Sequence, residues 1–311
     1  MGRQGTTSLF LLGKDYHLGD LLWLTAVIAE YRRQKEPATV IVGCPDRPVN
    51  RILERSPIID EVIYGSAVSE IRRDVARRGG RLVVHDLRPN SLALAMLKDS
   101  RYRLPWLYYR DLWMQPRGQW LATHLRLGQL RDYRPVLQLA DQDREMAAKL
   151  PKPYVLLAPH IGEYKLAATR ALWRRIKGWE WANWIQLTEA LQALGVNVMT
   201  LAAPDQTAVP GTRPLMGLPI TQVAGLIEGA AAHISGESGL WFIAAAVDTP
   251  FIIVPWWLPR PVNWASPMGA RHRLVYRDES TVENVAACFL DLQAIDVLPR
   301  KMVSGSDKVP T

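Results

Sequence analysis

The chain has 311 residues, 48% of them hydrophobic and 22% charged, and its formal net charge is +8. This length suits two domains of ~150 residues each, and the composition excludes disordered, collagen-like and low-complexity chains. The charge is uneven: residues 1–150 hold 24 Lys+Arg against 17 Asp+Glu, a net of +7, whereas residues 151–311 hold 14 against 13, a net of +1. A basic first half and a nearly neutral second half predict two different roles.

In the first half, apolar strands alternate with helical segments. Strands are predicted at 8–12, 39–42, 61–63 and 81–86, and helices at 20–34, 47–56 and 69–78. This alternation is typical of βαβ units around a parallel sheet. The aromatic and basic stretch 101–134 fits no single pattern.

A second series of alternating elements begins after Leu150. Strands are predicted at 154–158, 196–201, 233–235 and 251–254, helices at 183–194, 240–247 and 281–292, and a short strand followed by a helix at 220–231. The chain is therefore predicted to be an α/β protein of two Rossmann-like domains, residues 1–150 and 151–302. Residues 303–311 are expected to form a flexible tail.

The first candidate site segment is the loop Gly13–Gly19 and the helix start at Asp20. In open α/β sheets, ligands bind at the carboxyl ends of the strands, so this loop is placed to face a ligand. A carboxylate at this position fits two roles, either a site residue or a first-turn residue that only stabilises the helix dipole.

The second and third segments are candidates for binding an anion. Arg174, Arg175 and Lys177 precede the helix at 183–194, which suits either a phosphate site or a solvated basic turn. Gly236-Glu237-Ser238-Gly239 joins a strand to an alanine-rich helix, where glycines allow close backbone approach and the helix N-terminus offers free N–H groups. The alternative interpretation of that segment is a tight βα turn. It fits neither a nucleophile elbow nor a nucleotide-binding glycine motif.

Two cysteines, Cys44 and Cys288, are too few for a disulfide framework, so a reducing cytoplasm is expected. No cluster of metal-ligand residues is evident in the sequence, so no metal site is predicted. The longest apolar stretch, 239–258, is interrupted by Asp248 and Pro250, which argues against a membrane-spanning helix. A basic face is nevertheless suited to peripheral contact with an anionic membrane.

Together, five segments in this order resemble glycosyltransferase family 9, the ADP-heptose:lipopolysaccharide heptosyltransferases. They are Gly19–Leu22, Ser56–Ile63, His85–Arg88, Lys177–Leu187 and Gly236–Ala246. The resemblance implies a GT-B fold, in which two Rossmann-like domains with parallel sheets face a central cleft. The C-terminal domain of this fold binds the nucleotide sugar and the N-terminal domain binds the acceptor. It also implies inverting, metal-independent sugar transfer without a further cofactor.

The resemblance also assigns roles to individual residues. Asp20 matches the general base. The matched donor-binding residues are Lys177 at the leaving diphosphate, Glu237 near the sugar, Ser238 and Gly239 as the diphosphate cradle, and Asp205 at the nucleoside. The candidate acceptor-binding residues are His17, Lys14 and Arg88.

At several positions the sequence departs from the family pattern near the expected donor. Glu237 replaces an aspartate, Trp241 a histidine and Glu180 a proline, and Ala171–Trp173 stand where a hydroxyl-rich pair is usual. These departures suit a donor sugar other than heptose as well as heptose itself, so heptose or a similar sugar is expected, on a nucleotide that is expected to be ADP. Trp256 and Trp257 follow the last predicted strand, where they fit either stacking on a base or sugar ring or packing beneath a loop.

The expected enzyme thus moves a sugar to an anionic, lipopolysaccharide-type glycan at the cytoplasmic face of the inner membrane. One alternative keeps the fold but glycosylates a protein or modified nucleic acid, because a basic half also suits a phosphate backbone. Another is a non-catalytic relative that only binds nucleotide sugars. A dehydrogenase is least favoured, because the glycine fingerprint is absent.

Overall fold

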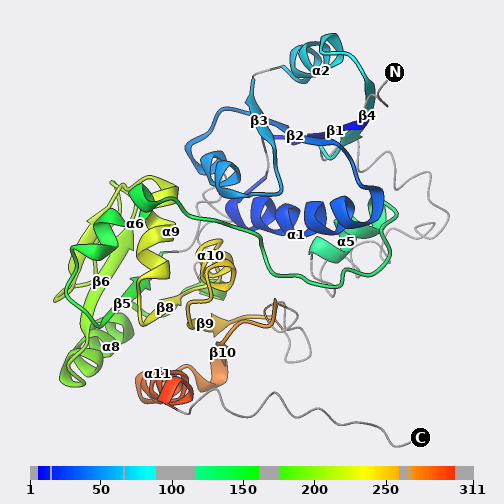
Figure 1. Ribbon diagram of the computed structural model, residues 1–311. Helices are drawn as coiled ribbons and strands as arrows, with labels where there is room; N and C mark the ends of the chain where they lie inside the picture. The colour runs from blue at the N-terminus through cyan, green and yellow to red at the C-terminus, as the bar shows by residue number, and fades with distance from the viewer. Residues whose placement is uncertain are drawn as a thin grey trace, which may run out of the picture.

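The computed structural model describes residues 6–14, 16–65, 67–88, 117–160, 175–258, 265 and 268–297. Its two parallel sheets lie one in each half of the chain (Figure 1). The elements of the first half are β1 (Thr6–Leu11), α1 (Leu18–Lys35), β2 (Thr39–Cys44), the 3-10 helix η1 (Pro48–Arg55), β3 (Glu61–Tyr64), α2 (Val68–Arg77), β4 (Arg81–Asp86) and α5 (Arg117–His124). They are followed by α6 (Asp141–Ala148), β5 (Tyr154–Ala158), α8 (Trp181–Ala193), β6 (Asn197–Ala202), β7 (Arg213–Met216), α9 (Ile220–Glu228), β8 (Ala232–Ser235), α10 (Leu240–Ala246), β9 (Phe251–Trp256), β10 (His272–Tyr276), η4 (Arg277–Glu279) and α11 (Val282–Val297).

The strand orders of the two sheets share one pattern. The first sheet has the order β3-β2-β1-β4, and the second has the order β10-β9-β8-β5-β6-β7. Numbered within its own half, the second sheet runs 6-5-4-1-2-3, which is the order of the dinucleotide-binding Rossmann fold, and the first sheet repeats its 3-2-1-4 part. Every described strand pair is parallel. The predicted α/β class with two Rossmann-like sheets is confirmed.

Both faces of each sheet are buried, which explains the nearly continuous apolar strands. In β1, Phe10 packs into the largest core cluster, whereas Leu9 and Leu11 pack on the opposite face with Ile71 of α2. In β5, Tyr154 and Leu156 enter that same large cluster, while Val155 and Leu157 pack with α8. This alternation follows from the two-residue period of a strand.

The largest core cluster extends across both halves of the molecule. Helix α1 of the first half lies against α10 of the second half (Figure 1). Trp23 of α1 meets Phe242 of α10 edge to face, with 5.2 Å between the ring centroids. The two halves therefore meet through packed side chains and not only through the connecting chain.

The predicted elements are largely confirmed, with several differences, among them helix α6, which was not predicted. The segment 220–231 begins directly as α9, so its predicted initial strand is wrong. Residues 48–55 form a 3-10 helix, which begins at Pro48, instead of an α-helix. Strands β7 and β10 were not predicted; both are edge strands of four or five residues with only one fully buried position, so their apolar signal is weak.

The boundary between the predicted domains stays a prediction. Helix α6, which precedes residue 150, packs on α9 of the second half (Figure 1). Gly225 of α9 permits this contact, because a Cβ there would lie 1.9 Å from the backbone oxygen of Asp143.

Candidate functional site

The strand orders point to one edge of each sheet as the place for a ligand. In open α/β sheets, ligands bind at the carboxyl ends of the strands where the strand order reverses direction. In the first half this switch point lies between β1 and β4, and in the second half between β5 and β8. The β1–α1 loop leaves the first switch point, and the turn Gly236–Gly239 leaves the second.

The β1–α1 loop is held by hydrogen bonds from neighbouring elements. The hydroxyl of Tyr16 donates to the backbone oxygen of Leu87 beyond β4, at 2.8 Å. The guanidinium of Arg47 donates to the backbone oxygens of Lys14 at 2.6 Å and Tyr16 at 3.0 Å. The loop therefore has a defined course before α1 begins.

Asp20 lies in the first turn of α1 and is partly exposed. Its Oδ2 accepts a hydrogen bond from the backbone N–H of His17 at 3.0 Å. The helix-stabilising role considered from the sequence is therefore present, because the carboxylate satisfies an N–H at the positive end of the helix. This geometry is compatible with a second role, since Asp20 is only partly buried at the first switch point.

The two switch points are brought together at Gly239. A Cβ at this position would lie 2.7 Å from Cβ of Leu18 and 3.0 Å from the backbone nitrogen of Gly19. A Cβ at Gly19 would in turn lie 2.8 Å from the ring of Phe242. The turn of the second half therefore touches the residues that immediately precede Asp20, and only glycine fits at either position without displacing its neighbours.

Lys177 and Glu237 form an ion pair beside this turn. Their side chains are only 11% and 14% exposed, respectively. The ammonium of Lys177 also lies 5.1 Å from the ring centroid of Trp257, within the range of a cation–π interaction. Ser238 accepts a long hydrogen bond of 3.4 Å from the backbone N–H of Leu240, at the start of α10.

A basic and aromatic pocket of about 390 Å³ adjoins the ion pair. It is lined by Arg175, Ile176, Trp256, Trp257 and Arg277. Arg277 is anchored by donating to the backbone oxygen of Ile176. The sequence analysis missed Arg277. A prediction of strand β10 would have identified it, because Arg277 directly follows the carboxyl end of that strand, where ligands bind.

The candidate acceptor residues lie at the first switch point. Lys14 and His17 are exposed in the β1–α1 loop. Arg88 follows β4 and pairs with Asp86 through two hydrogen bonds of 2.8 and 2.6 Å. Arg88 also lines a pocket of about 550 Å³ with Arg72 and Arg73 of α2, so this edge of the first half is basic.

Two residues singled out from the sequence lie away from the ion pair. Asp205 is exposed in the turn after β6, on the same sheet edge as Gly236 but separated from β8 by β5. Trp241 is fully buried against Phe242 and Phe251, so it packs in the core, and its influence on the donor sugar stays a prediction. Asp15, Arg174 and the Ala171–Trp173 stretch lie outside the described residues.

A half-buried histidine, His85, and a fully buried one, His233, are unsuited to act as general bases near neutral pH. Burial lowers the pKa of His85 in β4 to about 4 and the pKa of His233 in β8 to about 4. Among the described residues, no group of three or more His, Cys, Asp or Glu side chains is arranged to hold a metal ion. Within the same ranges, no helix has both the length and the apolar composition needed to cross a bilayer.

Comparisons with known proteins agree with this architecture. Residues 120–254 match the model of glycosyltransferase family 9 (heptosyltransferase). No curated protein matches the sequence. A glycosyl transferase family 9 structure from Veillonella parvula DSM 2008 is similar with a TM-score of 0.69 at 14% identity, covering 94% of this chain and 98% of that one.

Two structures from Escherichia coli are similar over nearly their whole length. ADP-heptose lps heptosyltransferase II has a TM-score of 0.66 at 17% identity, covering 93% of this chain and 99% of that one. The heptosyltransferase WaaC with ADP has a TM-score of 0.59 at 15% identity, covering 91% of this chain and 99% of that one. The chain therefore has the GT-B-like fold of these structures, and its residues 120–254 are similar to glycosyltransferase family 9 (heptosyltransferase).

Proposed function

We propose that this protein is an inverting, metal-independent glycosyltransferase that moves a sugar from a nucleotide diphosphate to an acceptor hydroxyl. The second half binds the donor and the first half binds the acceptor. The observation that carries the proposal is the approach of Gly239 to Leu18 and Gly19, which sets the buried Lys177–Glu237 pair near Asp20.

Asp20 acts as the general base in this mechanism. Its carboxylate takes the proton of the acceptor hydroxyl while the hydroxyl oxygen forms a bond to the anomeric carbon of the donor. The bond from that carbon to the diphosphate breaks on the opposite face, so the configuration inverts. The partial exposure of Asp20 supports this role, because an acceptor can reach the carboxylate.

Cations of the second half stabilise the leaving diphosphate. Lys177 lies at the turn, and Arg175 and Arg277 line the adjoining pocket. Preorganised positive charge in a partly dry site supplies the electrostatic stabilisation that a divalent cation otherwise provides. Backbone N–H groups of the Ser238–Gly239 turn add to it.

The donor is an ADP-linked heptose or a similar sugar. Two WaaC structures of this fold hold ADP and ADP-2-deoxy-2-fluoro heptose. Glu237 and Trp257 flank Lys177 and are the residues assigned to the donor sugar. Asp205 is assigned to the nucleoside.

The acceptor is an anionic, lipopolysaccharide-type glycan at the cytoplasmic face of the membrane. The pocket lined by Arg72, Arg73 and Arg88 supports this assignment, as does the net charge of +7 of residues 1–150. Lys14 and His17 extend the same basic edge toward Asp20.

Thermal denaturation with ADP, ADP-heptose and other nucleotide sugars tests the donor, and transfer to a lipopolysaccharide core tests the acceptor. ADP-heptose is expected to raise the Tm without added metal and to be consumed only with acceptor present. Donor binding without transfer to any glycan, protein or nucleic acid would instead identify a nucleotide-sugar-binding relative. The absence of a Tm shift with any nucleotide diphosphate would refute the proposal that the protein is a glycosyltransferase.

A further inference from the structure

The two halves of the molecule touch at several places, including the hydrogen bond from Arg134 to the backbone oxygen of Ala245, and two of these contacts are built in different ways. One is the contact of Leu18 and Gly19 with Gly239 and Phe242, here named the mouth contact. The other is the contact of η1 in the first half with α6, which precedes residue 150 but packs on α9 and is counted here with the second half; this contact is named the joint and is built on Arg55 and Asp143. The mouth contact consists of close-fitting apolar and backbone atoms, whereas the joint is an ion pair.

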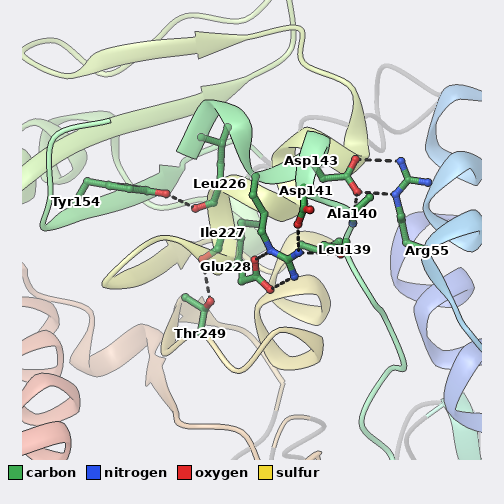
Figure 2. Close-up of polar contacts among 11 residues, drawn as sticks. Arg55, Leu139, Ala140, Asp141, Asp143, Tyr154, Leu226, Ile227, Glu228 and Thr249 are labelled. Atoms are coloured by element: carbon green, nitrogen blue, oxygen red, sulfur yellow. Dashed lines mark hydrogen bonds and ion pairs between the residues drawn. The ribbon is translucent and has the colours of Figure 1, made fainter. Parts of the chain in front are cut away.

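The joint is a buried, two-pronged pair (Figure 2). Arg55 donates from Nε to Oδ2 of Asp143 at 2.5 Å and from Nη2 to Oδ1 at 3.0 Å. Asp143 is 2% exposed, and its Oδ2 also accepts the backbone N–H of Ala140 at 2.9 Å. Both carboxylate oxygens of Asp143 are therefore occupied by fixed donors.

The chain on either side of the joint is fastened as well. The backbone oxygen of Arg55 accepts the N–H of Gln138 at 2.6 Å, and the hydroxyl of Ser56 donates to the oxygen of Val136 at 2.7 Å. The end of η1 is thereby bound to the connecting segment as well as to α6.

Packed elements link the joint to both parts of the site. On the first-half side, Ile52 and Leu53 of η1 share a core cluster with α1, which begins beside Asp20. On the second-half side, α6 rests on Gly225 of α9, and α9 leads through β8 into the turn at Gly236. A rotation at the joint would therefore change the distance between Asp20 and the Lys177–Glu237 pair.

We propose that Arg55 and Asp143 are a positioning pair that fixes the orientation of the two halves and so aligns Asp20 with the donor turn. A bidentate guanidinium–carboxylate pair is suited to this role because it restrains angle as well as distance. An apolar contact of the same area would hold the two halves together but would restrain their relative rotation less.

A matched control lies one residue away from Asp143. Arg144 forms a similar two-pronged pair with Glu228, including a hydrogen bond of 2.9 Å from Nη2 to Oε1. This pair joins α6 to α9 within the second half and does not cross to the first half. Loss of either pair removes a comparable interaction, but only the Arg55–Asp143 pair links η1 of the first half to α6.

The test is amide hydrogen exchange of residues 240–246, which face α1 at the mouth contact. Arg55→Gln is expected to speed this exchange at least about fivefold, whereas Arg144→Gln changes it less than about twofold. Exchange in α8, remote from both contacts, serves as the internal reference. Equal effects of the two variants at residues 240–246, or a uniform rise that includes α8, would overturn the proposal.

Two further variants keep the test decisive if Arg55→Gln fails to fold. Arg55→Lys keeps the charge but loses the planar fork, and it is expected to shift exchange in the same direction by a smaller factor. Asp143→Asn keeps an acceptor for the N–H of Ala140 while removing the anion. If neither variant changes exchange at residues 240–246, the proposal is wrong.

A second test, which measures enzyme kinetics, rests on the proposed function. With ADP-heptose as donor, Arg55→Gln is expected to lower kcat at least about tenfold while the KM for donor stays within about twofold, because the donor-binding residues lie in the second half. An unchanged kcat would show that the pair does not position Asp20. If ADP-heptose does not bind the unaltered protein, the proposed function fails, while the exchange experiment still decides the role of the joint.

Discussion

The two switch points hold their charged side chains in opposite ways. In the first half, Asp20 is partly exposed and accepts a hydrogen bond from the backbone of its own helix turn. In the second half, Lys177 and Glu237 are largely buried and bind each other across 60 residues of sequence. An exposed carboxylate suits exchange of a proton with an incoming hydroxyl, whereas a buried pair keeps its charge ready without reorganisation.

The largest change in activity is expected from Asp20→Asn. The amide oxygen of asparagine can still accept the N–H of His17, so the helix start is kept while the base is lost. Transfer is expected to fall about 10²–10⁴-fold. Initial rates of transfer measure this effect, and Lys35→Ala, at an exposed side chain in the last turn of the same helix, is the control.

Donor binding by the same variant distinguishes the roles of the two halves. Asp20→Asn should leave the Tm shift produced by ADP unchanged, because Asp20 lies outside the donor half. Near-full turnover of this variant would show that another group removes the proton. A lost ADP shift would place Asp20 at the donor instead.

Lys177→Met is expected to affect stability and donor binding together. It leaves Glu237 without its cation, and breaking a buried pair in this way costs about 3–5 kcal/mol. Since both partners keep some exposure, we expect a value near the lower end of that range. Chemical denaturation measures the free energy of unfolding.

The double variant Lys177→Met/Glu237→Gln sharpens this prediction. Removing both charges leaves none uncompensated, so most of the lost stability should return. The affinity for ADP should remain about tenfold or more below that of the unaltered protein, because the cation at the diphosphate is still missing. Restored ADP affinity would argue that Lys177 serves only the fold.

Gly239→Ala tests how closely the two switch points must approach. The added methyl group would press on Leu18 and on the backbone of Gly19. Overpacking of this kind costs about 1–3 kcal/mol and should move Asp20 away from the turn. The Tm and the transfer rate should both fall, whereas Ser238→Ala, next in the chain, should leave the Tm within about 1 °C.

The last prediction compares one histidine from each half, the half-buried His85 and the fully buried His233. Burial lowers the pKa of His85 and of His233 to about 4, while an unfolded histidine titrates near ~6.5. Between these values the unfolded chain binds protons that the folded protein does not, so stability should fall as the pH drops from ~6.5 toward 4.

The Tm at pH 7 and pH 4.5 measures this difference. His85→Gln and His233→Gln should each reduce the pH dependence. Similar reductions are expected if the halves unfold together, as their shared core suggests. An unchanged pH dependence in both variants would show that other groups cause the acid sensitivity.

The sequence predicted the fold well where the periodicity is strong. Strand 81–86 and strand 154–158 have the predicted bounds, because their apolar runs end sharply at charged or turn residues. The edge strands β7 and β10 were not predicted from the sequence. Each has a neighbouring strand on one side only, so fewer of its positions need to be apolar.

The site was predictable in its parts but not in its contacts. Asp20, Lys177 and the Gly236–Gly239 turn were found from motifs that are local in sequence. Trp241 and Trp257 were indistinguishable in the sequence, yet only Trp257 lies beside Lys177, since Trp241 faces the core side of α10.

The sequence by itself determined the alternation of strands and helices, the glycine turns and the uneven charge, because these depend on near neighbours along the chain. The tertiary structure alone decided that Glu237 pairs with Lys177, that Gly239 touches Gly19, and that Arg55 reaches Asp143. Each of these contacts joins segments far apart in sequence. The relative orientation of the packed elements fixes such contacts, and no local pattern of residues encodes that orientation.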